Sequence, residues 1–291
     1  MSTSWRELEV WASGELAGAG LSAAQREARW MVEQASGFDG AELFDELDAT
    51  PVERAEVRLR SMVERRIAGE PLQYVLGRWG FRSLDLAVDR RVLIPRPETE
   101  SVVDEVLAEV DRLAGPDREP VNVVDLGTGS GAIALSVASE RAVTTVWATD
   151  VSADALVVAT ANLSGLGRAA ARVRLAQGSW FDALPDELRS AVGVIASNPP
   201  YVDPAAALPS EVHEWEPHVA LYAGDVGRSS LDVLVRGSGA WLRPDGALVC
   251  EISPEQAQWV THLAEEHYCE ARVHPDLSGR DRVLVARFPR R

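Results

Sequence analysis

The chain of 291 residues is poor in cysteine, in basic side chains and in long apolar runs. Its two cysteines, Cys250 and Cys269, form neither a metal-type pair nor a disulfide framework. There are 29 Lys and Arg against 45 Asp and Glu, and the net charge of −16 argues against broad binding to nucleic acid phosphates. No apolar run approaches the roughly 18 residues of a membrane span, and the polar, acidic N-terminus does not resemble a signal peptide. We expect a cytoplasmic protein that binds neither DNA nor a membrane directly.

Metal-ligand patterns are missing as well. Histidine and glutamate gather in "HEWEPH", residues 213–218, where Pro217 breaks the helical spacing that an H-E-x-x-H site requires. We therefore expect no metal ion, and we interpret this segment as a rim or lid loop.

The spacing of apolar residues divides the chain into three parts. Residues 1–70 have helical spacing, with Ser22 expected to cap one helix and Thr50 another, and they contain no catalytic constellation. We interpret them as a packing module or a substrate-docking domain. Residues 71–95 alternate instead, as in "LDLAVDRRVLI", and predict a β-hairpin connector. Residues 96–291 form the third and largest part.

From Val121 onward, apolar runs typical of strands alternate with helical patterns. This order predicts an α/β fold with a seven-stranded, mostly parallel, doubly wound sheet. The last two strands are separated only by "SGRD", so we expect them to pair as an antiparallel hairpin. The expected strands have the sequences VNVVDLG, TTVWATDV, RVRLAQGS, VGVIASN, ALVCEIS, EARVHPDL and RVLVARF.

The stretch "VVDLGTGSGAIAL" is an apolar strand followed by a glycine-rich turn and a helix. Asp150 ends the next strand, where a carboxylate can accept both hydroxyls of a ribose. Gly127, Gly129 and Ala132 also fit the dinucleotide pattern G-x-G-x-x-G/A, so a dehydrogenase-type or purely binding domain stays open on these residues. Asp125 favours S-adenosylmethionine (SAM), because a carboxylate suits an ammonium and a sulfonium but opposes a pyrophosphate.

A second motif, "SNPPY", ends the fourth expected strand beside that turn. To methylate a planar nitrogen, a site must aim the lone pair at the methyl group, because the pKa of such an NH₂ is too high for prior deprotonation. The Asn198 side-chain oxygen and the Pro199 carbonyl are two acceptors that can hold the NH₂, and Pro199 and Pro200 restrict the backbone. Tyr201 can pack flat on the planar group. This chemistry needs neither a metal nor a covalent enzyme intermediate.

Together, "DLGTGSG", Asp150 and "NPPY" resemble Rossmann-like SAM-dependent methyltransferases that modify planar nitrogens. "GEPLQYVLGRWGF" and "VLIPRPETE", which ends at Glu100, narrow the resemblance to the release factor glutamine methyltransferases, the PrmC/HemK family. The resemblance extends over nearly the whole chain, including the terminal "DLSGRDRVLVARF". Adenine-amino nucleic acid methyltransferases and ribosomal-protein glutamine methyltransferases share NPPY and remain the alternatives.

The resemblance implies methylation of the N5 nitrogen of glutamine in the Gly-Gly-Gln loop of class I peptide chain release factors. SAM is the implied cofactor, S-adenosylhomocysteine is the product, and we expect a monomer that grips the release factor with its helical domain. The implied SAM contacts are Asp125, Gly127, Thr128, Gly129, Ser130, Gly131, Asp150, Trp180 and Asn198. The target amide is expected against Asn198, Pro199, Pro200 and Tyr201, and the implied pocket cover is Arg96, Pro97, Glu98 and Glu100.

Three segments depart from the family pattern. Ser179 stands where an aspartate is common, residues 225–231 ("DVGRSSL") replace a stretch richer in glycine, and Pro254 lies where relatives often have a glycine-containing sequence. These differences concern the adenine contact, the rim of the site and the docking of the partner.

Overall fold

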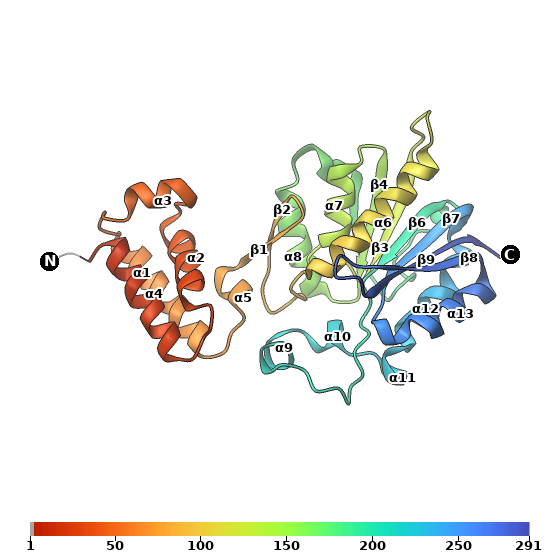
Figure 1. Cartoon of the computed structure of the whole chain (residues 1–291). Coiled ribbons are helices and arrows are strands. Elements are labelled where there is room, and N and C mark those ends of the chain that lie inside the picture. The colour runs from red at the N-terminus through yellow and green to blue at the C-terminus, as the bar shows by residue number, and fades with distance from the viewer. Residues whose placement is uncertain (1–2, 291) are drawn as a thin grey trace. The chain divides into compact units, whose positions relative to one another are not determined.

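The structure, a computed structural model, describes residues 3–290, which divide into two compact units (Figure 1). The first unit comprises the chain up to Arg78 together with Leu208–Trp215. The second comprises Trp79–Ala207 and the chain from Glu216 onward. Within the described range, no helix is both long and apolar enough to cross a membrane.

The first unit is a set of short helices around an apolar core. Helix α1 begins with a capping box, in which the Ser4 hydroxyl accepts from the Glu7 amide and the Glu7 carboxylate accepts from the Ser4 amide. Leu8, Met31 and Leu59 are fully buried at the centre. The helices are α1 (Trp5–Gly18), α2 (Ala24–Ser36), α3 (Gly40–Glu46), α4 (Glu53–Ile67), α5 (Leu72–Leu76) and, from later in the chain, α9 (Ser210–Trp215).

A buried arginine joins three segments of this unit. The side chain of Arg66 in α4 is 7% exposed, and its guanidinium binds Glu27 of α2 at 2.7 Å and Glu211 of α9 at 2.6 Å. It also donates to the carbonyl of Glu70. Because a buried charge without partners is costly, these acceptors keep α9 packed on the first unit.

Two of the expected helix caps are wrong. Helix α2 begins at Ala24 with Ala23 as its N-cap, and α4 begins at Glu53, so neither Ser22 nor Thr50 caps a helix. Ser22 is exposed in a turn, and the buried face of α4 begins only at residue 55. Packing of the apolar face, rather than the local capping residue, therefore decides where each helix begins.

The second unit is built on a seven-stranded sheet with the order β5-β4-β3-β6-β7-β9-β8. The first five strands in this order pair in parallel, and β9 pairs antiparallel with both β7 and β8. The predicted mostly parallel sheet with a terminal antiparallel hairpin is confirmed. The strands are β3 (Val121–Leu126), β4 (Thr144–Asp150), β5 (Val173–Gln177), β6 (Val192–Ser197), β7 (Leu242–Glu251), β8 (Tyr268–Pro275) and β9 (Asp281–Pro289).

Helices cover both faces of this sheet (Figure 1). On one face, α6 and α7 pack on Val123 and Val194, and on the other, α12 and α13 pack on Val124 and Ile195. This alternation along β3 and β6 is what a strand buried on both faces requires. The helices are α6 (Pro97–Ala114), α7 (Ala132–Glu140), α8 (Ala153–Ser164), α10 (His218–Leu221), α11 (Gly224–Gly227), α12 (Ser229–Gly237) and α13 (Ala257–His267). Short 3₁₀ turns lie at Gly167–Arg172, Asp186–Leu188, Ser238–Ala240 and Pro254–Gln256.

The predicted β-hairpin is present as β1 (Arg78–Phe81) and β2 (Leu84–Ala87). Arg82, in its turn, donates to Glu140 of α7 and to Asp104 of α6, each at 2.7 Å. These ion pairs attach the hairpin turn to the helices of the second unit. The domain boundaries after residues 70 and 95, between the docking domain, the connector and the catalytic domain, stay predictions.

The strand order reverses at β3, which has β4 on one side and β6 on the other. At their carboxyl ends, the Ser197 hydroxyl of β6 donates to the Leu126 carbonyl of β3 at 2.6 Å. Ligands of open α/β sheets bind in the crevice at such a reversal. The turn after Leu126 and the motif after Ser197 therefore meet at one edge of the sheet.

The buried carboxylate of Glu109 in α6 gives a test of the packing in this unit. Its side chain is 1% exposed, and it binds Arg112 of the same helix and Arg287 of β9. Glu109→Gln removes the buried counter-charge of both guanidinium groups, and Arg287 keeps only its longer pair with Glu270 at 3.5 Å. We therefore expect the free energy of unfolding to fall by about 2 kcal/mol. Chemical denaturation measures this value.

A matched control is Asp186→Asn, because the Asp186–Arg189 pair has side chains that are 90% and 56% exposed. We expect it to change stability by less than about 0.5 kcal/mol. Equal effects of the two substitutions would contradict the role given to Glu109.

Candidate active site

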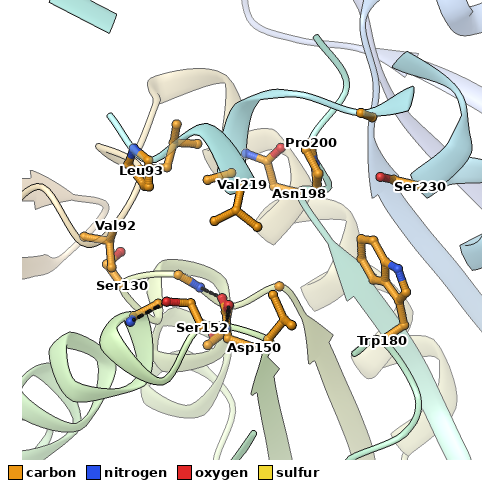
Figure 2. A pocket seen from close by; sticks show the side chains of 18 of the residues that line it. Val92, Leu93, Ser130, Asp150, Ser152, Trp180, Asn198, Pro200, Val219 and Ser230 are labelled. Carbon is orange, nitrogen blue, oxygen red and sulfur yellow. Dashed lines mark hydrogen bonds between the residues drawn. The ribbon is translucent and has the colours of Figure 1, made fainter. Parts of the chain in front are cut away.

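A cavity of about 350 Å³ opens at the carboxyl ends of β3, β4 and β6 (Figure 2). In Figure 2, Asp150 and Ser152 lie on one side of the cavity, Asn198 and Pro200 lie on the other, and Trp180 stands at its edge. The predicted site residues that line it are Gly127, Thr128, Gly129, Ser130, Asp150, Trp180, Asn198 and Pro200. The predicted residues outside the lining are Arg96, Pro97, Glu98, Glu100, Asp125, Gly131, Pro199 and Tyr201.

The glycine-rich turn is held by the neighbouring strand. The amides of Gly127 and Thr128 both donate to the Thr149 carbonyl at 2.9 Å, and the Gly129 amide donates to the Asp150 carboxylate at 2.9 Å. Gly127 and Gly129 have φ of +77° and +56°, a region that favours glycine. The backbone of the turn can therefore face the cavity directly at these two positions.

Each carboxylate oxygen of Asp150 accepts one hydrogen bond from the protein and can accept another. One carboxylate oxygen accepts from the Gly129 amide, and the other accepts from the Ser152 amide at 2.9 Å. The Ser152 hydroxyl in turn caps α8 by accepting from the Ala155 amide. Each oxygen of a carboxylate has more than one lone-pair site, so Asp150 is fixed in place and can still accept from two hydroxyls. This fits the vicinal diol of a ribose.

Asp125 is fully buried one layer behind the cavity. Its Oδ2 accepts from the Thr128 hydroxyl at 2.6 Å and from the Ala134 amide at 3.2 Å, which fixes the turn against the start of α7. Its Oδ1 is buried and has no hydrogen-bond partner within residues 3–290. Burial raises the pKa of Asp125 to about 7. An orphaned, buried carboxylate oxygen behind Thr128 fits a nearby cation such as the SAM ammonium; a direct contact stays a prediction.

Trp180 lies in a compact turn after β5. Its φ of +47° is uncommon for a residue other than glycine, and such conformations concentrate at functional sites. The preceding Gly178 has no room for a Cβ, which would lie 2.9 Å from the Ala183 amide nitrogen. Ser179 also lines the cavity, so a serine stands there where the family pattern has an aspartate.

Asn198 belongs to a chain of hydrogen bonds that links two distant motifs. Its Nδ2 donates to the Thr99 hydroxyl at 3.0 Å, and that hydroxyl donates to Glu251 Oε2 at 2.6 Å. The Tyr201 hydroxyl donates to the other Glu251 oxygen at 3.1 Å. Burial raises the pKa of the Glu251 carboxyl, and burial together with this carboxylate raises the pKa of Tyr201.

The residues of the Arg-Pro-Glu-Thr-Glu segment, 96–100, make contacts with different parts of the second unit. Pro97 begins α6, and Glu100 accepts from the Arg82 amide of the hairpin at 3.0 Å. Arg96 forms an ion pair with the buried Glu216. Of this segment only Thr99 lines the cavity. The four predicted cover residues are therefore its neighbours, and the residue that contacts Asn198 was not among them.

From Pro217 onward, the chain after the second motif lines the cavity, as expected of a rim loop. The expectation is wrong for residues 213–215, which belong to α9 of the first unit. The Val202 amide donates to the Leu221 carbonyl at 3.0 Å, and the Ala223 amide donates to the Val202 carbonyl at 3.1 Å. Val219 and Tyr222 then line the cavity. In the part of the chain that the structure describes, no group of three or more His, Cys, Asp or Glu side chains could hold a metal ion.

Other lining residues carried no recognisable sequence signal. Arg91, Val92 and Leu93 belong to the predicted alternating connector. Alternation in such a short segment does not show which of its residues faces a cavity. Val219 could be located only to the rim loop, because four-residue helices such as α10 have no reliable pattern.

Two of the segments that depart from the family pattern, residues 225–231 and the turn at Pro254, contact each other at the rim of the cavity. Pro254 begins a 3₁₀ turn, where Gln256 forms a capping box with Ser253. The side-chain Nε2 of Gln256 also donates to the Gly227 carbonyl at 2.7 Å. Gly227 has φ +79° and lies so close to the Tyr201 carbonyl that a Cβ would be 2.2 Å from its oxygen. The rim is therefore packed directly on the second motif.

Comparison with known proteins agrees with this geometry. Residues 7–77 match the PrmC N-terminal domain, and residues 110–214 match the methyltransferase small domain. A release factor glutamine methyltransferase of Cereibacter sphaeroides is 40% identical over 94% of this chain and 95% of its own. One of Rhodopirellula baltica is 36% identical over 97% and 96%.

Solved structures support the fold alone. The catalytic domain of human Mettl16, solved with an RNA hairpin, has a TM-score of 0.54 and 15% identity, covering 80% of this chain and 81% of that one. A methyltransferase from Pyrococcus furiosus has a TM-score of 0.51 and 17% identity, covering 81% and 98%.

The sheet, the glycine turn and these relatives define a SAM-dependent methyltransferase. The relatives that are more than 30% identical over almost their full length identify the family within this class of methyltransferases. The chain belongs to the release factor glutamine methyltransferase family.

Asp125 gives a pH-dependent prediction. Its pKa is raised in the folded protein, so its ionised form costs stability above pH 7, and the cost disappears as the pH falls toward the unfolded value near 4. Without ligand, Asp125→Asn should therefore raise the free energy of unfolding at pH 8 by about 1–3 kcal/mol, and by less at pH 5. Denaturant titrations at both pH values measure the change. A loss of stability at pH 8 would contradict this account.

Gly227 and Gly279 form a matched pair for testing the rim. Both have positive φ, at +79° and +82°, but only Gly227 lacks room for a Cβ. Gly279→Ala should cost about 1 kcal/mol of backbone strain, whereas Gly227→Ala must also displace the Tyr201 carbonyl. We expect Gly227→Ala to lower both stability and turnover, and Gly279→Ala to keep turnover. Thermal unfolding and methylation rates test this, and equal turnover in the two variants would refute the packing argument.

Proposed function

We propose that this enzyme transfers the methyl group of SAM to the N5 nitrogen of the glutamine in the Gly-Gly-Gln loop of class I peptide chain release factors. The products are N5-methylglutamine and S-adenosylhomocysteine. Family membership supports the substrate class. The observation that carries the chemistry is the position of Asn198, which directly follows β6 beside the glycine turn and lines the same cavity.

The residues of the cavity fit SAM. Asp150 has free acceptor positions for ribose hydroxyls, Trp180 offers an aromatic surface for the adenine, and the glycine turn with Asp125 behind it suits the methionine ammonium. When bound, SAM supplies an electrophilic methyl group on a sulfonium. The roles of these residues toward SAM are part of the proposal.

Asn198 and Pro199 then orient the target amide. The Asn198 side-chain oxygen and the Pro199 carbonyl accept the two N–H groups of the glutamine, which leaves its nitrogen lone pair aimed across the cavity. As the nitrogen gains positive charge in forming its bond to carbon, both acceptors stabilise it more strongly than in the ground state. One of these N–H protons is released to water after transfer. Tyr201, which does not line the cavity, holds the motif through its hydrogen bond to Glu251.

The first unit is proposed to bind the release factor outside the methylated loop. It contains no catalytic constellation, and it exposes large apolar side chains such as Phe44 at 71% and Val10 at 70%. We further propose a monomer located in the cytoplasm, without direct binding to DNA.

Labelled SAM tests the substrate assignment. We expect label in a class I release factor, and none when the glutamine of its Gly-Gly-Gln loop is replaced by alanine. An oligonucleotide rich in adenine serves as the competing substrate. Label that survives the glutamine replacement, or that enters the oligonucleotide instead, would overturn the proposal.

Asn198→Ala tests the two-acceptor mechanism. Loss of one acceptor should lower kcat by about 100-fold or more, because oxyanion-hole-type groups contribute on that scale. SAM affinity should stay within about threefold, since the predicted SAM contacts elsewhere in the cavity are untouched. Calorimetry and single-turnover methylation measure the two quantities. Full turnover in this variant would refute the mechanism.

A further inference from the structure

We propose that Glu251 and Thr99 are positioning residues for methyl transfer, because together they determine which way the Asn198 carboxamide faces. This inference rests on the proposed function. It concerns two residues other than Asn198 and Pro199, the proposed acceptors of the target amide. Glu251 ends β7, and Thr99 lies in the first turn of α6. The two side chains are buried, with relative exposures of 1% and 4%.

The single proton of the Thr99 hydroxyl determines which atoms of Asn198 it can bind. Thr99 Oγ1 donates that proton to Glu251 Oε2 at 2.6 Å. A hydroxyl whose proton is used can only accept further hydrogen bonds. The 3.0 Å contact between Thr99 and Asn198 must therefore be donated by the Asn198 NH₂ group.

This constraint leaves Asn198 Oδ1 as the atom available to a substrate. No hydrogen bond to that oxygen occurs among residues 3–290, and Asn198 lines the cavity. If the carboxamide were reversed, its NH₂ would face the NH₂ of the target glutamine, and donor would oppose donor. The rate of transfer therefore depends on the orientation that Thr99 imposes.

Glu251 also binds the far end of the Asn-Pro-Pro-Tyr motif. Its other oxygen accepts from the Tyr201 hydroxyl at 3.1 Å, so one carboxylate holds both ends of the Asn-Pro-Pro-Tyr segment. Around it, Arg282 of β9 favours the ionised form, and Glu98 of α6 opposes it. Arg282 is itself paired with Asp276 at 3.2 Å.

The carboxylate must be ionised to accept from both hydroxyls. Protonated Glu251 would donate to one of them. When it donates to Thr99, that hydroxyl regains a free proton and no longer has to accept from Asn198. Since burial raises the pKa of Glu251, activity should fall as the pH decreases through that raised value. Glu251→Gln removes the titration, so the acidic limb of the kcat profile should be lost.

Thr99→Val and Thr99→Ser form the matched pair for the main test. Valine keeps the shape but removes the hydroxyl, so kcat should fall by about tenfold or more, with SAM affinity and the KM for the release factor within about twofold. Serine keeps the hydroxyl and should restore most of the rate. Wild-type kcat in Thr99→Val, a serine variant as slow as the valine variant, or an acidic limb unchanged in Glu251→Gln would each overturn the proposal.

A spectroscopic readout separates this proposal from the proposed function. The side-chain NH₂ resonances of Asn198 in isotope-labelled protein are assigned by their absence in Asn198→Ala. They should shift in Thr99→Val and not in Thr99→Ser, whether or not any release factor is methylated. An Asn198 NH₂ chemical shift that is unchanged in Thr99→Val would refute the positioning role. Failure of the wild-type protein to label a release factor would refute only the substrate assignment.

Discussion

The pairing of β3 with β6 is the contact on which the candidate site depends. These strands are far apart in the sequence, yet they lie side by side and end at the same edge, where the Ser197 hydroxyl binds the Leu126 carbonyl. The glycine turn follows one strand and the Asn-Pro-Pro-Tyr motif follows the other. A cofactor site and an amide site therefore share one cavity because of strand order, before any side chain is considered.

Buried polar groups then convert this adjacency into a defined geometry. Asp150 fixes the glycine turn, Asp125 fixes the beginning of α7, and Glu251 joins Thr99 to Tyr201. Each is a carboxylate in or near a low-dielectric interior, where satisfied hydrogen bonds are strong and missing ones are costly. Stability and positioning are coupled at this edge, so we expect ligand binding to relieve part of the cost of burying Asp125.

Much of this arrangement could be predicted from the sequence, and the reasons differ by feature. Apolar runs such as "VNVVDLG" and "VGVIASN" are typical of strands buried on both faces, so the strands of the sheet and its terminal antiparallel hairpin could be predicted, whereas the order of the strands in the sheet was not. The caps at Ser22 and Thr50 were wrong because packing outweighed a weak local preference. Thr99 was missed because nothing in a helical pattern shows that its hydroxyl meets a side chain a hundred residues later. Val219 lies on a loop whose path depends on long-range contacts.

The most direct test of the account is mass spectrometry of a class I release factor after incubation with this enzyme and SAM. We expect one added methyl group, located on the side-chain nitrogen of the glutamine in the Gly-Gly-Gln loop, and none with the Asn198→Ala variant. A methyl group on any other residue, or equal methylation by the Asn198→Ala variant, would contradict the central claim that Asn198 orients that amide for transfer.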